Sequence, residues 1–121
     1  MEGTKSTAGL IKDFRAAPGI SIPHLLPNTK VLVETTLSVF ELRVIDYEHV
    51  EITGTDHRFH TPIIGRFIQS VYDVAGAIKF PGWIGKNLRM DIEFKDAMFR
   101  STPVVAGCVI GEGYRYDVFG P

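Results

Sequence analysis

The feature that most constrains the fold of this chain is a two-residue alternation of apolar and polar side chains that begins near Lys30. The alternation is cleanest in residues 87–95. There the apolar set is Leu88, Met90, Ile92 and Phe94, and the polar set is Arg89, Asp91, Glu93 and Lys95. Successive side chains of a strand point to opposite faces, so the pattern predicts strands with one face in the core and the other in water.

Similar but shorter segments fill the chain after Lys30, and turn-forming residues separate them. We expect strands in residues 30–34, 40–44, 50–53, 63–72, 98–102, 103–110 and 114–119, with turns at residues 46–48, 95–97 and 111–113. Residues 73–86 are rich in small and turn-forming residues, so we expect turns there. Seven or eight short strands in 121 residues predict a mainly β fold, either a small antiparallel β-barrel or a two-sheet sandwich.

The N-terminal part of the chain has a different pattern. Leu10, Ile11 and Phe14 share one face of a helix for which Ser6 is a suitable N-cap, so one short helix is expected at residues 6–15. Pro18 disfavours its continuation, and residues 20–28 are interpreted as a linker whose apolar side chains cover the mouth of the core. We therefore expect a single domain over residues 1–121, with the helix and linker in residues 1–29 and the barrel in residues 30–121.

A short N-terminal helix followed by bent antiparallel strands resembles the Sm-like and SH3-like small barrels. The resemblance covers residues 6–54 and depends on the order of the elements, not on a motif. It implies a small barrel, and the stretch 55–86 departs from that plan. A fold shared at this level does not identify a function.

Charge excludes one class of function. The chain has 13 Lys and Arg against 14 Asp and Glu, and its net charge of −1 excludes a strongly basic nucleic-acid-binding protein. The charge is uneven, because residues 31–60 hold two basic and six acidic side chains whereas residues 61–90 hold four basic and one acidic. Such a basic stretch can attract a small anionic partner locally.

The basic stretch contains the candidate ligand-binding residues, which are Lys79, Phe80, Trp83, Lys86 and Arg89. Lysine and arginine can neutralise phosphates, and an aromatic ring can stack on a base, so the segment predicts a site for single-stranded nucleic acid or a nucleotide. It is not a Walker A motif, because Asn87 follows Lys86 where Ser or Thr would be needed. The alternatives are a structural turn whose aromatic residues plug the end of the barrel, or a contact with another protein.

A second candidate, less favoured, is a metal site at His57 and His60, which follow Asp56 in the sequence. The two imidazoles would meet one ion only in a helical turn or a tight loop, because side chains three positions apart point to opposite faces of an extended chain. A third ligand would have to come from elsewhere, such as His24 or His49. The simpler interpretation is a polar surface loop.

The C-terminal segment supplies two further expectations. Tyr114 and Tyr116 lie two residues apart and Phe119 follows them, so these aromatic residues are expected to pack in the core, with base stacking as the alternative. Cys108 lies in an apolar run and is expected to be a buried small side chain, not a reactive thiol.

Taken together, the sequence predicts a non-catalytic binding or assembly module that forms a homo-oligomer and needs no cofactor. The alternative is the anion-binding protein described above, and a small metal-dependent enzyme comes third. One cysteine, no secretory leader and uncharged stretches such as residues 101–111, shorter than the roughly 18 residues of a membrane span, favour a cytoplasmic protein with no membrane association.

Overall fold

The computed structural model describes residues 18–73 and 78–119. The helix expected at residues 6–15 lies outside these ranges. The described strands are β1 (Gly19–Ser21), β2 (Lys30–Thr35), β3 (Val39–Val44), β4 (His49–Gly54), β5 (Ile63–Val71), β6 (Lys79–Pro81), β7 (Trp83–Gly85), β8 (Arg89–Phe94), β9 (Ala97–Arg100), β10 (Val104–Gly111) and β11 (Tyr114–Phe119). Two short 3-10 helices, η1 (Ile22–His24) and η2 (His57–Phe59), complete the described elements, and neither is long and apolar enough to cross a membrane.

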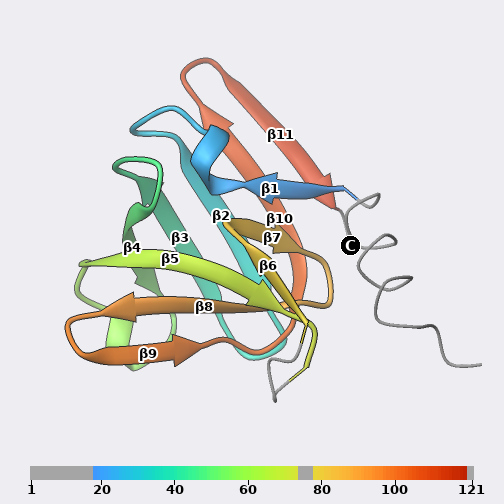
Figure 1. Cartoon of the computed structure of the whole chain (residues 1–121). Coiled ribbons are helices and arrows are strands. Elements are labelled where there is room, and N and C mark those ends of the chain that lie inside the picture. Colours follow the sequence, from blue (N-terminus) through green and yellow to red (C-terminus); the bar gives the residue numbers. More distant parts are fainter. Residues whose placement is uncertain (1–17, 74–77, 120–121) are drawn as a thin grey trace, which may run out of the picture.

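The strands form antiparallel sheets, which confirms the mainly β prediction (Figure 1). The main path runs β11-β10-β2-β3-β4-β5-β8-β9, and β6 also pairs with β5. β1 and β7 form a separate two-stranded sheet. The pairings of the described strands do not close the path into a ring, so β11 and β9 are its two ends.

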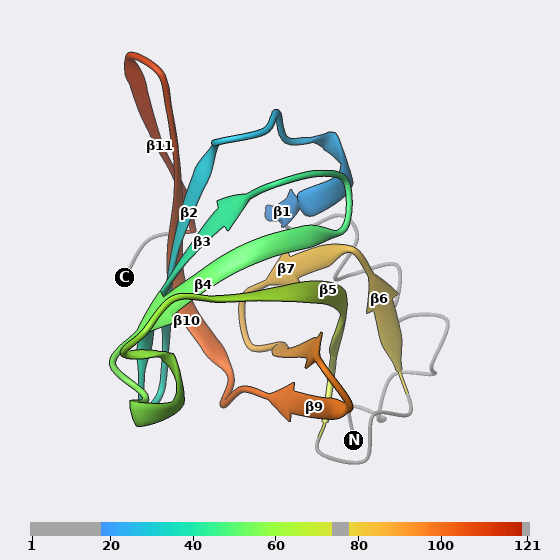
Figure 2. The same ribbon diagram turned by 90° about the vertical axis from the view of Figure 1, so that its left-hand side faces the viewer.

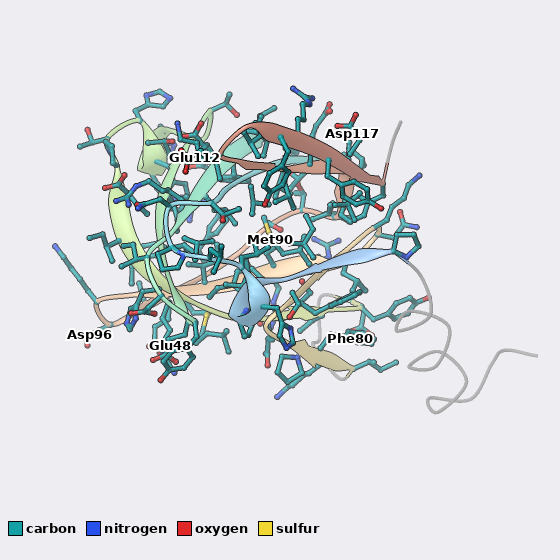
Figure 3. All side chains as sticks on the ribbon, turned by 90° about the horizontal axis from the view of Figure 1, so that it is seen from above. Glu48, Phe80, Met90, Asp96, Glu112 and Asp117 are labelled. Carbon is teal, nitrogen blue, oxygen red and sulfur yellow. The ribbon has the colours of Figure 1, made fainter. Side chains whose placement is uncertain are left out.

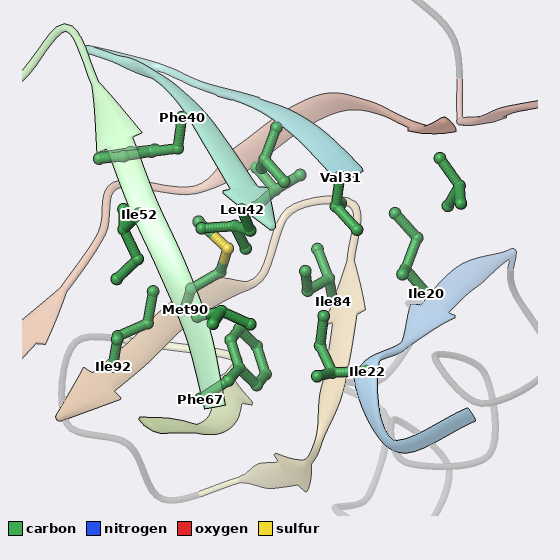
Figure 4. Close-up of a cluster of buried hydrophobic side chains, with 14 of the residues drawn as sticks. Ile20, Ile22, Val31, Phe40, Leu42, Ile52, Phe67, Ile84, Met90 and Ile92 are labelled. Atoms are coloured by element: carbon green, nitrogen blue, oxygen red, sulfur yellow. The ribbon is translucent and has the colours of Figure 1, made fainter. Parts of the chain in front are cut away.

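The main sheet is strongly bent, as the side view shows (Figure 2), and the larger of two buried apolar clusters forms its core. Strands from both ends of the path contribute to it, because Phe119 of β11 and Phe99 of β9 belong to the same buried cluster. Leu42, Ile52 and Met90 lie inside this cluster on β3, β4 and β8 (Figure 4). The alternation read from the sequence therefore corresponds to the inner and outer faces of a curved sheet.

The short helix η2 covers part of this core with an aromatic side chain. Phe59 is fully buried, and its ring lies 5.7 Å from the ring of Phe40, 5.6 Å from Phe94 and 5.0 Å from Phe99, in edge-to-face arrangements. Asp56 caps η2 by accepting a hydrogen bond from the backbone N–H of Arg58 at 3.0 Å. The polar segment after β4 is thus attached to the core by the buried ring of Phe59.

Two segments that were expected to be irregular contain strands, so those expectations are wrong in part. Residues 73–86 include β6 and β7, and the predicted linker, residues 20–28, includes the last two residues of β1 and all of η1. Each of these elements has three residues, which is too short for an alternation to be visible in sequence. Ile20 and Ile22, on β1 and η1, do enter the core, as expected of apolar residues in that segment.

Candidate functional site

The candidate segment 79–89 divides into buried and exposed parts. Phe80 on β6 is buried and packs with Ile78 and Leu88, and the half-buried Trp83 on β7 lies against them. This small cluster is separate from the main core. The two aromatic side chains are therefore brought together, and Phe80 has no free face on which a base could stack.

Trp83 is positioned by the pairing of β7 with β1. Its indole occupies the space beside Gly19, because a Cβ placed on Gly19 would lie 2.0 Å from Trp83 Cζ2. Its Nε1 atom is buried and has no hydrogen-bond partner among the described residues. Gly82, between β6 and β7, has a φ of +67°, and a Cβ there would lie 2.9 Å from the ring of Pro23.

The basic residues of the segment are spread over three elements. Lys79 on β6 and Arg89 on β8 both pair with Val71, which lies between them on β5. Lys86 is exposed in the tight turn between β7 and β8, where the N–H of Leu88 donates to the carbonyl of Gly85 at 3.2 Å. Lys79 and Arg89 thus lie on either side of Val71, whereas Lys86 lies in the β7–β8 turn.

A shallow hollow of about 310 Å³ lies beside the aromatic cluster. Its lining residues are Ser21, His24, Phe80, Pro81 and Trp83. The Ser21 hydroxyl and His24 Nδ1 are 2.6 Å apart, so the two polar groups of the hollow already bond to each other. None of the basic residues of the segment lines this hollow.

The structure also shows a buried ionic group beside the segment, which the sequence pattern did not predict. Asp91 on β8 was expected to face water but is only 1% exposed. Arg100 on β9 donates from Nε to Asp91 Oδ1 at 2.6 Å and from Nη2 to Oδ2 at 2.8 Å, and Gln69 Nε2 donates to Oδ2 at 3.0 Å. Burial by itself would raise the pKa of Asp91, but the hydrogen bonds from Arg100 and Gln69 outweigh it and lower the pKa, and Lys79 adds a favourable charge.

This ionic group also acts on Lys79. The Asp91 carboxylate attracts Lys79, although Arg100 already balances its charge, so Lys79 is held beside an ion pair that is neutral overall. The sequence does contain one indication of this ion pair. Asp91 and Arg100 lie on the two strands of a predicted hairpin, and opposite charges that face each other on paired strands commonly interact.

His57 and His60 lie at the two ends of the η2 turn, but among the described residues the structure does not bring a third candidate ligand to them. The His57 side chain is 87% exposed, and His60 Nε2 lies 3.1 Å from the carbonyl oxygen of Thr55. His49 bonds to Asp46 at 2.9 Å, and His24 bonds to Ser21. Within residues 18–73 and 78–119, no group of three or more His, Cys, Asp or Glu side chains is arranged to hold a metal ion.

Asp56 stabilises this loop by accepting hydrogen bonds from Arg58. The side-chain hydrogen bonds from Arg58, followed by the backbone bond from the same residue, lower the pKa of Asp56. The Arg58 guanidinium also lies 4.7 Å above the ring of Phe99. These contacts hold η2 on the end of the core, which fits the interpretation of the segment as a polar surface loop.

The C-terminal strand β11 is the most exposed strand of the fold among the described residues. Tyr114 is 54% exposed and Tyr116 is 63% exposed, so the expectation that they pack in the core is wrong, whereas Phe119 is buried. The tyrosines lie on the core-facing side of β11, but the β10–β11 hairpin projects past the neighbouring strands (Figure 2). Lys30, the first residue of β2, pairs with Ile110, so the hairpin beyond that point has no third strand beside it.

The two candidate regions lie apart in the molecule. Asp117 and Glu112 mark the β10–β11 hairpin, and Phe80 marks the aromatic cluster at the other side of the view from above (Figure 3). A second hollow of about 320 Å³ lies next to the hairpin and is lined partly by Leu32, Glu34, Cys108, Arg115 and Asp117. Cys108 itself is buried, as expected.

No family model, curated protein or solved structure matches this chain.

Proposed function

We propose that the protein is a non-catalytic assembly module that forms a homo-oligomer through the outer edge of β11. The observation that carries the proposal is the exposure of this end strand on both faces, from Tyr114 to Asp117. No strand in residues 18–73 or 78–119 pairs with its outer edge. A free edge presents unpaired backbone N–H and C=O groups to any chain that can add a strand.

The side chains of β11 favour association over protection. Natural edge strands are commonly blunted by lysine, proline, inward-facing charge or very short length. β11 has six residues, contains neither lysine nor proline, and exposes two tyrosines. Tyrosine is enriched at protein interfaces, because its ring buries a large area while its hydroxyl tolerates water.

Support for a small barrel as the scaffold of this module comes from the contacts between β8 and β10. The N–H of Val104 donates to the carbonyl of Leu88 at 2.9 Å, and the N–H of Asn87 donates to the carbonyl of Val104 at 2.8 Å. These bonds bring the start of β10 alongside the start of β8, although the two are not adjacent in the main path. A nearly closed sheet of this kind would make β11 an appendage whose edge is available for assembly.

The mass of the native protein in solution tests the proposal. Native mass spectrometry and light scattering over a range of concentrations should show an oligomer, and Tyr116→Lys should shift it toward the monomer by placing a charge on the edge. Tyr47→Lys is the matched control, since Tyr47 is 66% exposed in the β3–β4 turn and should leave the mass unchanged. A wild-type chain that stays monomeric at all concentrations would overturn the proposal.

A second candidate function is the binding of an anionic ligand, either single-stranded nucleic acid or a nucleotide. It is favoured by the positions of Lys79 and Arg89 on either side of Val71. Binding of a labelled single-stranded oligonucleotide should then weaken as salt increases, and Lys79→Gln with Arg89→Gln should reduce the salt dependence. Trp83→Ala should cost about 1–3 kcal/mol if the indole stacks on a base. Affinity that does not depend on salt would reject this function.

A further inference from the structure

We infer that two copies of the chain associate along β11 about a twofold axis that passes beside Tyr116, with Arg115 of each copy opposite Asp117 of the other. The inference deepens the proposed assembly function and depends on it. Its basis is the backbone geometry of the β10–β11 hairpin and the order of charges on β11.

The hairpin determines which backbone groups point outward. Gly111 pairs with Tyr114 across the two-residue turn formed by Glu112 and Gly113. In such a hairpin the closing pair exchanges backbone hydrogen bonds, and hydrogen-bonded and non-hydrogen-bonded pairs then alternate along the strands. The backbone groups of Tyr114 and Tyr116 therefore face β10, and those of Arg115 and Asp117 face the outer edge.

A second copy of β11 can satisfy these outward groups. With Tyr116 opposite itself, each Arg115 lies opposite an Asp117 of the other copy in a hydrogen-bonded pair. Each such pair exchanges two backbone hydrogen bonds, so both pairs together use the outward N–H and C=O groups of all four residues. The two Tyr116 residues then form the non-hydrogen-bonded pair, in which Cα atoms approach to about 4.5 Å.

The charges select this register over its neighbours. Arg115 and Asp117 lie on the same face of β11, and their Nε and Oδ1 atoms are 3.4 Å apart. In the proposed register each arginine meets a carboxylate of the second copy, which extends this pair into a cluster of four alternating charges. A shift of the second strand by two residues either way would place Arg115 opposite Arg115, or Asp117 opposite Asp117, and like charges directly opposite are destabilising.

The remaining end of the sheet is a poorer partner for β11. β9 has four residues, and its only charged side chain, Arg100, is engaged with Asp91. It therefore offers no acidic side chain to Arg115. A self-complementary strand favours a closed dimer, whereas pairing β11 with β9 would be a head-to-tail contact that builds rings or filaments.

Reversal of the charges tests the register. Arg115→Asp alone and Asp117→Arg alone should each raise the dimer dissociation constant by roughly tenfold, because both put like charges opposite each other. The double variant Arg115→Asp/Asp117→Arg should restore wild-type dissociation, since each aspartate again meets an arginine. Both side chains are more than half exposed, so all three variants should keep the wild-type circular dichroism spectrum and unfolding midpoint.

Cross-linking provides an independent readout of the same register. In a Cys108→Ala background, Tyr116→Cys should form an intermolecular disulfide rapidly on mild oxidation, because the paired Cα atoms lie within disulfide range. Arg115→Cys and Asp117→Cys are the matched controls and should cross-link much more slowly, since neither residue lies opposite itself.

The outcomes separate the register from the broader proposal. A dimer in which the double variant stays weakened, or in which Arg115→Cys cross-links faster than Tyr116→Cys, would overturn the inferred register and leave assembly through β11 standing. An oligomer larger than a dimer would overturn the twofold arrangement. A monomer at all concentrations would overturn the inference together with the assembly function.

Discussion

Replacing Arg100 by methionine should destabilise the fold by an amount that depends on pH. Arg100 makes two hydrogen bonds to Asp91, whose side chain is only 2% exposed. Methionine keeps much of the length of the arginine stem but removes the charge and all its donors. The variant leaves Asp91 with Gln69 as its remaining side-chain donor among the described hydrogen bonds.

The size of the effect follows from the burial of the pair. Breaking a buried ion pair from one side costs about 3–5 kcal/mol, because a charge is left in a poorly solvated place. The Arg100 side chain is 31% exposed, so water reaches the site, and we expect a loss of about 3 kcal/mol in the free energy of unfolding at pH 7.

The pH dependence gives the sharper test. In the wild-type fold the pKa of Asp91 lies below its ordinary value of 3.8, so its stabilising contribution is present above pH 3.8 and is lost as the pH falls through the folded pKa. Without Arg100, burial dominates and should raise the folded pKa above 3.8, so the variant loses stability as the pH rises. The difference between the two proteins should be largest near pH 7 and should shrink toward pH 3.

Urea unfolding followed by circular dichroism at several pH values measures this difference. Arg43→Met is the matched control, because Arg43 and Glu51 form an ion pair at 3.3 Å that is one-third exposed on both sides, and its loss should cost at most about 1 kcal/mol. Equal losses in the two variants, or a loss in Arg100→Met that is the same at pH 3 and pH 7, would refute the account of Asp91 as a buried, ionised group.

Three further predictions concern packing. Gly19→Ala should lower the free energy of unfolding by about 1–3 kcal/mol, because the new Cβ would occupy the place of the Trp83 indole. It should also change the fluorescence of Trp83, the single tryptophan, and unchanged fluorescence and stability would contradict the β1–β7 contact. Phe59→Ala should cost about 3–5 kcal/mol in chemical unfolding, since it removes the ring that three other phenylalanines surround, and a loss below 1 kcal/mol would mean that η2 does not cover the core. The Cys108 thiol should react with an aromatic disulfide reagent only after denaturant is added, and immediate labelling of the native protein would show that the residue is accessible.

Much of the fold could be predicted from local pattern. β3 and β4 bury alternate residues as their sequences indicate, β8 does so apart from Asp91, and the apolar side chains of all three contribute to the main core. The hairpin turn at residues 111–113 also follows from sequence, since Gly113 adopts a φ of +80° that a glycine accepts without strain. These features depend on residues close to one another in the chain.

The failed expectations have one cause in common. Asp91 occupies a polar position in the alternation, but the outer face of β8 is covered where Arg100 and Gln69 meet it. Tyr114 and Tyr116 occupy apolar positions, but Tyr114 lies beyond the end of β2, and Tyr116, level with Val31, lies on the end strand of the described sheet, so both stay exposed. In both cases the alternation predicts the face of the strand, whereas burial depends on what packs against that face.

In the candidate binding segment, too, the sequence indicates the residue types and the tertiary structure decides where they lie. Its residue types suggested an anion site, and the structure divides them among a buried aromatic cluster, two strands beside β5 and a turn. The placement of Trp83 depends on Gly19, more than sixty positions away, and no pattern within the segment predicts such a contact. That β11 is an end strand of the described sheet is likewise a property of strand order, which the β10–β2 pairing decides.

The sequence by itself therefore determined the antiparallel β class, most strand positions and the apolar residues that enter the core, because a strand's two faces follow from a local period of two. Only the tertiary structure decided that Asp91 is buried, that the tyrosines of β11 are exposed, and that β11 lies at one end of the described sheet. Those properties depend on which distant segments lie side by side, since burial and free edges arise from long-range pairing and not from the period of any one strand.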